Sequence, residues 1–411
     1  MADGPLKPLA RVVDFYVPAA EIQARISAFQ GALSASSLDG ALIKQNADLY
    51  YLCGSIQDSY LYVPNDGEPL LMVYRNRERA ALESPLPNVE ALPSLGKLTQ
   101  ILGDNGYRAP KRLGVEMDVL PAALFLNLKK IFAQSELVDV SFLLRDQRKI
   151  KSAYEIEQQR KAAAICHRMY EKAFSVLREG VTEVEAQGIL EAEARRWGHP
   201  GPVRMRGFNQ EMFYGHLISG PEAVPTSTLD SPTGGVGLTA SFSHGPSTKR
   251  LRAGEPINVD LFGNFNGYLA DQTRLFCIGD PGAELQRAYE ASLTILETLA
   301  SLIVPGLPIR DLFKKAHELA EKLGYGEYFM GLPDSRPKFI GHGVGLEADE
   351  FPFVTENNNG ELEAGMVVAL EPKLIIPDVG VIGIEDTMHV TEDKAESLTT
   401  SPRVLAVLPR T

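Results

Sequence analysis

The chain has 411 residues, of which 44% are apolar and 23% are charged. This length favours two domains, and the composition excludes a mostly disordered chain, a collagen-like repeat and a disulfide scaffold. Lys and Arg number 41 against 53 Asp and Glu, a net charge of −12. Because an acidic surface repels phosphate backbones and anionic membranes, we expect neither nucleic-acid nor membrane binding.

The cysteines and the N-terminal residues indicate a cellular compartment. Cys53, Cys166 and Cys277 lie far apart with no CxxC pair, which argues against a disulfide framework or a cysteine-ligated zinc site. Residues 1–13 contain no apolar core of signal-peptide length. No run of about 20 apolar residues, as a membrane span requires, occurs in the chain. We therefore expect a cytoplasmic protein with buried free thiols.

The first third of the chain alternates helix-like and strand-like segments. Amphipathic helices are expected over 20–33 and 121–132, and strands over 40–43, 49–53, 69–73 and 113–116. This alternation predicts an α/β layer structure. Residues 144–151 are polar and basic and indicate a linker. We accordingly expect an N-terminal domain over 1–148 and a C-terminal domain over 153–411.

The rest of the chain mixes helices with short β-rich runs. A long helix is expected over 153–177, ending before Gly180, and Thr182 with Glu185 has the spacing of a capping box for a helix that ends near residue 197. Beyond residue 202, strands are expected over 257–262, 367–370 and 381–384, and helices over 285–302 and 309–323.

Carboxylates inside apolar runs are the most informative feature. Asp260 lies in INVDLFG, Glu371 in VVALEP and Glu385 in VIGIED. An unpaired buried charge is costly, so each of these side chains needs a cation or a dense hydrogen-bond network. The sequence alone leaves both options open, but three such carboxylates in one half of the chain favour a cation site.

Two further residues complete a set of metal-ligand types. Asp271 follows Asp260 by eleven positions, across a hairpin turn expected at Asn266-Gly267. His342 lies in GHGVGL, where glycines permit close backbone approach. Four carboxylates and one imidazole suit two divalent ions about 3.5 Å apart, a hydrolytic arrangement. Such ligands favour Mn²⁺ or Co²⁺, with Fe²⁺ or Zn²⁺ as alternatives. A dinucleotide fingerprint is excluded because Leu346 stands where the third glycine is needed.

These residues resemble the pattern of the pita-bread metallopeptidases, which comprise Xaa-Pro dipeptidase (prolidase), aminopeptidase P, methionine aminopeptidase and the related creatinase. The family pattern is an Asp, a second Asp eleven positions later, a His in GHGxG, a Glu before Pro, and a Glu fourteen positions further on. The matching residues here are Asp260, Asp271, His342, Glu371 and Glu385. Residues 38–55 and 144–163 also resemble the creatinase-type N-terminal domain and the segment that enters the catalytic domain.

The resemblance implies a fold and a mechanism. It implies an α/β creatinase-like N-terminal domain and an α+β pita-bread catalytic domain. By analogy, Asp260 binds one metal ion, Asp271 and Glu385 bridge both, and His342 and Glu371 hold the second. A bridging water or hydroxide would be the nucleophile, with Glu371 carrying its proton. His244 matches a histidine that contacts the substrate or the tetrahedral intermediate. Two-domain relatives commonly form homodimers, so a homodimer is expected as well.

The departures from the family pattern concern the substrate. Asp349 stands where the peptidases usually carry a His, and Gly383 stands where prolidases and aminopeptidase P commonly carry an Arg. These changes predict a more negative and more open pocket, with Asp349 as a substrate contact. A free substrate carboxylate would then need Arg204, Arg206 or a partner subunit. His216 lies in an expected substrate wall, although a partly buried structural histidine would look the same.

Three functions therefore remain in view. The leading one is a dinuclear metal hydrolase that cleaves the peptide bond before proline, acting on small peptide or amide substrates. The second is a non-peptidase on the same scaffold that hydrolyses a small C–N bonded metabolite, as the Asp349 and Gly383 exchanges indicate. The third is an inactive binding scaffold, which five intact ligand residues argue against.

Overall fold

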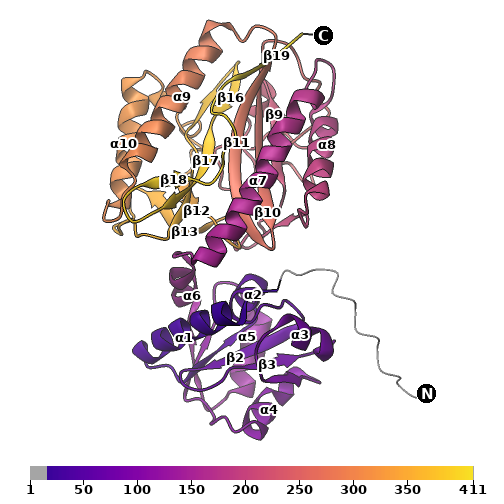
Figure 1. Cartoon of the computed structure of the whole chain (residues 1–411), viewed down its shortest axis with the longest axis vertical. Helices are drawn as coiled ribbons and strands as arrows, with labels where there is room; N and C mark the ends of the chain where they lie inside the picture. Colours follow the sequence, from indigo (N-terminus) through magenta and orange to yellow (C-terminus); the bar gives the residue numbers. More distant parts are fainter. Residues whose placement is uncertain (1–15, 411) are drawn as a thin grey trace, which may run out of the picture. The chain divides into compact units, whose positions relative to one another are not determined.

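The computed structural model describes residues 16–410 (Figure 1). Its internal contacts divide the chain into two compact units, Met1–Gln147 and Arg148–Thr411. Among residues 16–410, no helix combines the length and the apolar character that crossing a bilayer requires.

The first unit contains a six-stranded mixed sheet in the order β4-β3-β2-β1-β5-β6. Its strands are β1 (Gly40–Ile43), β2 (Ser59–Pro64), β3 (Leu70–Val73), β4 (Val89–Ala91), β5 (Arg112–Val115) and β6 (Glu136–Asp139). Its helices are α1 (Ala19–Ala35), α2 (Asn46–Cys53), α3 (Arg77–Glu83), α4 (Leu98–Asp104), α5 (Ala122–Ile131) and α6 (Ser141–Arg148), whose last residue, Arg148, is the first residue of the second unit. Leu42 and Met72 of the sheet share one apolar core with Leu98 and Leu128 of the helices. The α/β layer structure is confirmed.

The predicted strand over 49–53 is wrong, because these residues belong to α2. The Gln45 side chain accepts a hydrogen bond from the backbone N–H of Asp48 at the start of this helix, and Gly54 ends it with a φ of 75°. A short apolar run fits a strand and a buried helix equally well. The cap and the terminal glycine, rather than the run itself, distinguish the two.

The predicted linker over 144–151 is also wrong for its first half, since residues 141–148 form α6. The Asp139 carboxylate accepts a hydrogen bond from the Ser141 backbone N–H at 3.0 Å, which satisfies a donor that helix formation leaves free. Leu144 is fully buried. This segment is therefore polar because its helix is only partly buried, and not because it is a linker.

The second unit is built on a nine-stranded sheet whose main path is β13-β12-β14-β17-β11-β10-β9, with β18 paired to β17 and β19 to β11. Two further strand pairs, β15–β16 and β7–β8, lie off this sheet. The strands are β7 (Pro202–Val203), β8 (Met212–Phe213), β9 (Gly215–Ser219), β10 (Pro256–Phe265), β11 (Tyr268–Ile278), β12 (Phe339–Gly343), β13 (Glu350–Thr355), β14 (Val367–Leu370), β15 (Lys373–Ile376), β16 (Gly380–Gly383), β17 (Glu385–Val390), β18 (Ala395–Ser397) and β19 (Ala406–Leu408).

Helices form a layer on each side of this sheet (Figure 1). They are α7 (Ala153–Val176), α8 (Glu183–Arg196), α9 (Gly282–Leu302) and α10 (Ile309–Lys322). One apolar core joins α7 and α8 to β10 and β11, and a second joins α9 and α10 to β12, β14 and β17. The capping box at Thr182 and Glu185 is confirmed, with both reciprocal hydrogen bonds formed. The sheet is thus covered on both faces, and side chains near its middle are withdrawn from water.

Candidate metal centre and active site

The β10–β11 hairpin brings Asp260 and Asp271 to the same face of the sheet. Asn266 and Gly267 form its two-residue turn with φ values of 52° and 86°, as a type I′ turn requires. In the resulting register Asp260 pairs with Thr273, and Phe262 pairs with Asp271. Because residues two apart on a strand point the same way, both carboxylates project from one face. The predicted hairpin is confirmed.

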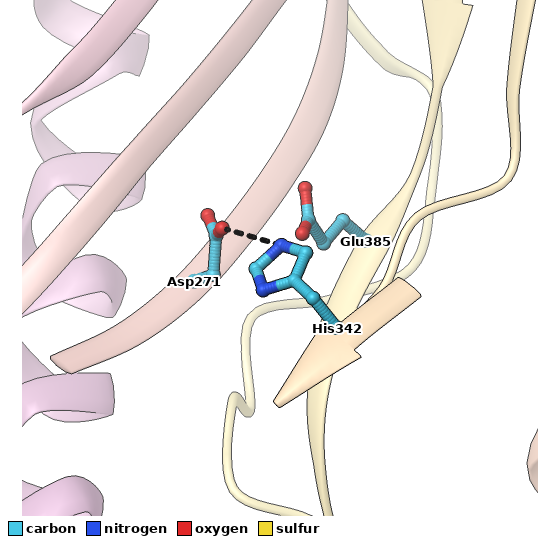
Figure 2. Close-up of side chains that lie close together, drawn as sticks. All are labelled: Asp271, His342 and Glu385. Atoms are coloured by element: carbon cyan, nitrogen blue, oxygen red, sulfur yellow. Dashed lines mark ion pairs between the residues drawn. The ribbon is translucent and has the colours of Figure 1, made fainter. Parts of the chain in front are cut away.

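Asp271, His342 and Glu385 converge from β11, β12 and β17 (Figure 2). One ligand atom of each lies within 4.8 Å of the others, and all three side chains are buried. His342 Nε2 lies 3.9 Å from Asp271 Oδ2. A Cβ on Gly341 or Gly343 would overlap the backbone of a neighbouring strand, so these glycines allow β12 to sit between its neighbours.

Asp260 and Glu371 lie beside this cluster, and a lysine joins them to it. Glu371 follows the last residue of β14 rather than lying inside the strand. Lys373 Nζ donates hydrogen bonds to Asp260 Oδ2 at 2.9 Å, to Glu371 Oε2 at 2.7 Å and to Glu385 Oε2 at 3.1 Å. The Lys373 side chain is 2% exposed. We did not expect this residue at the site, although a lysine at the start of the apolar run KLII is the same kind of signal as Glu371.

The missing side chain at Gly383 leaves space for the side chain of Lys373. The two residues are cross-strand partners in the β15–β16 pair, and a Cβ on Gly383 would lie 2.6 Å from Lys373 Cγ. The expectation that Gly383 opens the pocket is therefore wrong, because the lysine stem fills the space beside it. The positive charge in the carboxylate cluster comes from Lys373 instead.

The charges of the cluster are unevenly balanced. Burial, together with the charges of Glu385 and Asp260, raises the pKa of Asp271 well above its usual range. Burial also raises the pKa of Glu385 to about 7, against the opposing charge of Lys373. For Asp260 the nearby ammonium outweighs burial, and the pKa of that carboxyl is lowered.

The unsatisfied atoms fit a divalent cation among Asp271, His342 and Glu385. Asp271 Oδ1 and Glu385 Oε1 are buried oxygens without a hydrogen-bond partner. Buried carboxylate oxygens are normally hydrogen-bonded, paired with a charge or bound to a metal. Carboxylate and imidazole donors suit Mn²⁺, Co²⁺, Fe²⁺ and Zn²⁺. The oxygens of Asp260 and Glu371 that face Lys373 are, by contrast, already satisfied.

Thr273 and Arg274 support the cluster through Glu385 and its neighbour. The Thr273 hydroxyl donates to Glu385 Oε2 at 2.8 Å. Arg274 donates to the Glu385 carbonyl oxygen at 2.7 Å and to Asp386 Oδ1 at 2.6 Å. Such outer contacts fix the direction of a metal-binding carboxylate.

Two histidines stand next to Asp260. His216 Nε2 lies 3.6 Å from Asp260 Oδ2, and His216 Nδ1 lies 3.2 Å from His244 Nε2. The Ser227 hydroxyl lies 2.8 Å from His244 Nδ1. Burial lowers the pKa of His216 to about 3 and lowers that of His244, so both rings are neutral near pH 7. His216 lines the pocket beside the cluster, whereas His244 is not among the residues that line it.

The pocket wall is apolar and acidic. Its apolar part includes Met205, Met212, Leu229, Phe262 and Phe339. Asp230 and Asp349 add negative charge to the rim, and Asp349 Oδ1 lies 3.7 Å from His342 Nδ1. Among the described residues that line this pocket, Lys373 is the only lysine or arginine. Neither Arg204 nor Arg206 lines it, and Arg206 forms an ion pair with Glu347 at 3.5 Å.

A buried ion network holds the loop that follows His342. Glu350 forms ion pairs with Arg148 and Lys151, and its Oε1 atom accepts hydrogen bonds from the backbone N–H groups of Leu346 and Glu347. Although burial opposes its ionisation, the two cations lower the pKa of Glu350 to about 2. The network fixes the turn between His342 and Asp349.

Comparisons with known proteins agree with this architecture. Residues 157–392 match the signature of metallopeptidase family M24, and residues 25–150 match the creatinase/prolidase N-terminal domain. An uncharacterized peptidase of Staphylococcus epidermidis is 29% identical over 381 residues, covering 91% of this chain and 98% of the relative.

Solved structures show the same two-domain fold. A prolidase from Pyrococcus horikoshii OT3 is 27% identical with a TM-score of 0.79, covering 93% of this chain and 99% of its own. An Xaa-Pro dipeptidase from Bacillus anthracis is 24% identical with a TM-score of 0.81, covering 94% and 100%, and supports the fold alone. The creatinase-type N-terminal domain and the pita-bread C-terminal domain are confirmed. Because the family signature spans more than half of the chain, the protein belongs to metallopeptidase family M24 and is a metallopeptidase-type hydrolase.

Proposed function

We propose that this protein is a metal-dependent Xaa-Pro peptidase that recognises the free amino end of its substrate. The observation that carries the proposal is the buried Asp271–His342–Glu385 cluster with its unpartnered oxygens, of which Asp271 and His342 line an acidic pocket. The likeness to a solved prolidase at 27% identity supports cleavage before proline. Asp271, His342 and Glu385 would hold the divalent ion.

When bound, such an ion polarises the scissile carbonyl and lowers the pKa of a water molecule. The remaining steps depend on side chains of the chain. Glu371 is the base: its Oε2 atom accepts a hydrogen bond from Lys373 Nζ, while its Oε1 atom lies 3.7 Å from His342 Nε2, on the side of the cluster. Its carboxylate accepts the proton that water loses on attacking the carbonyl carbon, and returns this proton to the leaving nitrogen as the C–N bond breaks.

His216 and His244 would act on the carbonyl oxygen. If the Ser227 hydroxyl donates to His244 Nδ1, then His244 Nε2–H donates to His216 Nδ1 and the remaining proton lies on His216 Nε2. His216 Nε2 is buried and has no hydrogen-bond partner. A neutral imidazole with a free N–H donor at a pocket wall suits stabilisation of a developing oxyanion. In this proposal His216 touches the substrate and His244 orients His216.

The acidic rim selects the end of the substrate. Asp230 and Asp349 favour an ammonium group, and the one lysine of the wall is engaged with carboxylates. Among the described residues that line this pocket, no lysine or arginine other than the engaged Lys373 could therefore bind a C-terminal carboxylate. We expect peptides longer than two residues, and C-terminal amides, to be cleaved at least as well as the free dipeptide.

The test is hydrolysis by Mn²⁺-loaded protein of Leu-Pro, Leu-Pro amide and Leu-Pro-Gly, with Glu385→Ala as the blank. We expect cleavage of the amide and the tripeptide, loss of activity in the variant, and no cleavage of N-acetylated peptides. If the bound metal remains and none of the peptides is cleaved, the Xaa-Pro activity is wrong. The same acidic rim would then favour the second candidate, hydrolysis of a small cationic amide or guanidino compound.

The homodimer and the cytoplasmic location stay predictions from the sequence. Analytical ultracentrifugation is the direct test of the first. A mass near that of the 44.9 kDa monomer would contradict the dimer.

A further inference from the structure

The Lys373 ammonium group lies among carboxylate oxygens that could otherwise bind a metal ion. Its Nζ atom lies within 3.1 Å of one oxygen from each of Asp260, Glu371 and Glu385. Metal–oxygen bonds to these carboxylates are about 2.0–2.2 Å long. An ion bonded to the same three oxygens would lie in nearly the same volume as the ammonium group. The two cannot be present together in this arrangement.

The oxygens that Lys373 leaves free belong to the other side of the cluster. Glu385 Oε2 accepts hydrogen bonds from Lys373 and Thr273, whereas Glu385 Oε1 has no hydrogen-bond partner. Asp271 has no direct hydrogen bond to Lys373, and its Oδ1 atom is also without a partner. With His342, these residues form the group whose ligand atoms lie within 4.8 Å of one another. One ion fits there with Lys373 in place.

The local backbone is adapted to this lysine. Its cross-strand partner is Gly383, where any side chain would press on the lysine stem. The Lys373 carbonyl oxygen accepts a hydrogen bond from the Met330 backbone N–H at 2.8 Å, which fixes the start of β15. Ser292 donates to the carbonyl oxygen of the preceding Pro372 at 2.6 Å. The backbone at Lys373 is therefore held by hydrogen bonds, as its ammonium group is.

We propose that the Lys373 ammonium replaces one metal ion, so that this centre binds a single divalent ion at Asp271, His342 and Glu385 while Lys373 holds Asp260. This inference rests on the proposed metal site and takes the place of the two-ion centre expected from the sequence. It assigns Lys373 a charge-balancing and positioning role. Four carboxylates facing one another need several positive charges, and here one of the cations is part of the chain.

The first test compares metal binding by two isosteric variants, Asp260→Asn and Asp271→Asn. Mn²⁺ and Co²⁺ are added to metal-stripped protein, and bound metal is measured by titration calorimetry and elemental analysis. We expect one ion per wild-type chain. Asp260→Asn should keep that ion with an affinity within a few-fold of wild type. Asp271→Asn should lose more than about 100-fold, beyond what loss of an outer contact costs.

Each result separates this inference from the proposed function. Two ions per wild-type chain would overturn the inference and leave the metal-dependent peptidase intact. No bound ion would overturn both. Equal loss of affinity in the two variants would show that Asp260 is a ligand like Asp271, against the inference.

The second test restores the space that the lysine fills. Lys373→Gly should raise the metal content from one ion to two per chain, whereas Lys373→Met, which keeps most of the volume, should not. The double variant Lys373→Gly/Gly383→Arg places a cation on the opposite strand instead. It serves as a control in which loss of the lysine charge cannot be the cause of misfolding. Circular dichroism checks the fold of each variant. If folded Lys373→Gly still binds one ion, the lysine is not what excludes the second.

Discussion

Gly383 pairs with Lys373 across the β15–β16 strands, and a Cβ on the glycine would lie 2.6 Å from Lys373 Cγ. This relationship links two positions that differ in chemistry and lie ten residues apart. The missing side chain on one strand allows the long side chain on the other to reach three carboxylates.

Gly383→Ala should therefore destabilise the protein. The added methyl group presses on the Lys373 stem inside a packed region, and overpacking of this kind typically costs about 1–3 kcal/mol. Urea unfolding followed by circular dichroism measures the change. Gly188→Ala in α8 is the matched control, because nothing lies within 4 Å of that position, and it should stabilise the helix slightly. Equal stability of Gly383→Ala and wild type would contradict the packing argument.

Thr273→Val should weaken metal binding without unfolding the protein. The variant keeps the shape of the side chain and removes the hydroxyl that donates to Glu385 Oε2 at 2.8 Å. Loss of such a contact commonly lowers metal affinity about 10- to 100-fold. Competition with a chromogenic chelator measures the affinity for Mn²⁺. Thr273→Ser keeps the donor and should bind like wild type, and an unchanged affinity in Thr273→Val would count against this role.

Metal removal should lower thermal stability through the same site. An ion that binds only the folded state stabilises it by about 4 kcal/mol at a thousandfold excess over its Kd. Differential scanning fluorimetry with Mn²⁺ and with a chelator should show a clear shift for wild type and almost none for Asp271→Asn. Asp230→Asn, on the pocket rim, should keep the full shift. A metal-induced shift that persists in Asp271→Asn would place the ion elsewhere.

Glu350 should make stability depend on pH in the acid range. Its folded pKa of about 2 lies below the ordinary value of 4.5, because Arg148 and Lys151 outweigh burial. A lowered folded pKa gives stability that is complete above the unfolded pKa, and this stability is lost as the pH falls from about 4.5 toward 2. The size is on the order of 3 kcal/mol at neutral pH.

The measurement compares urea unfolding of wild type and Glu350→Gln between pH 7 and pH 3. The stability difference should be largest at pH 7 and shrink as the pH falls below about 4.5. The variant also removes one charged partner from both Lys151 and Arg148 in the interior, which adds to the loss at neutral pH. Glu356→Gln, at an exposed position, is the control. A difference that stays constant with pH would show that the Glu350 charge is not what stabilises the loop.

Local sequence signals predicted several elements correctly. The eleven-residue spacing between Asp260 and Asp271 and the Asn-Gly turn predicted the hairpin, because strand alternation and turn geometry are local properties. The capping box at Thr182 is local in the same sense. The strand expected over 49–53 failed because a short apolar run does not specify its own period.

The sequence by itself determined the family, the two-domain fold and the acidic residues set in apolar runs, since these depend on residue type, order and spacing along the chain. Only the tertiary structure decided what each charge meets. Lys373 and Asp260 lie 113 positions apart and touch because β10 and β15 are brought together by the fold. In a buried site the balance of charge depends on distances of a few ångströms across the sheet. Such distances between segments cannot be derived from the residue spacing within any one segment.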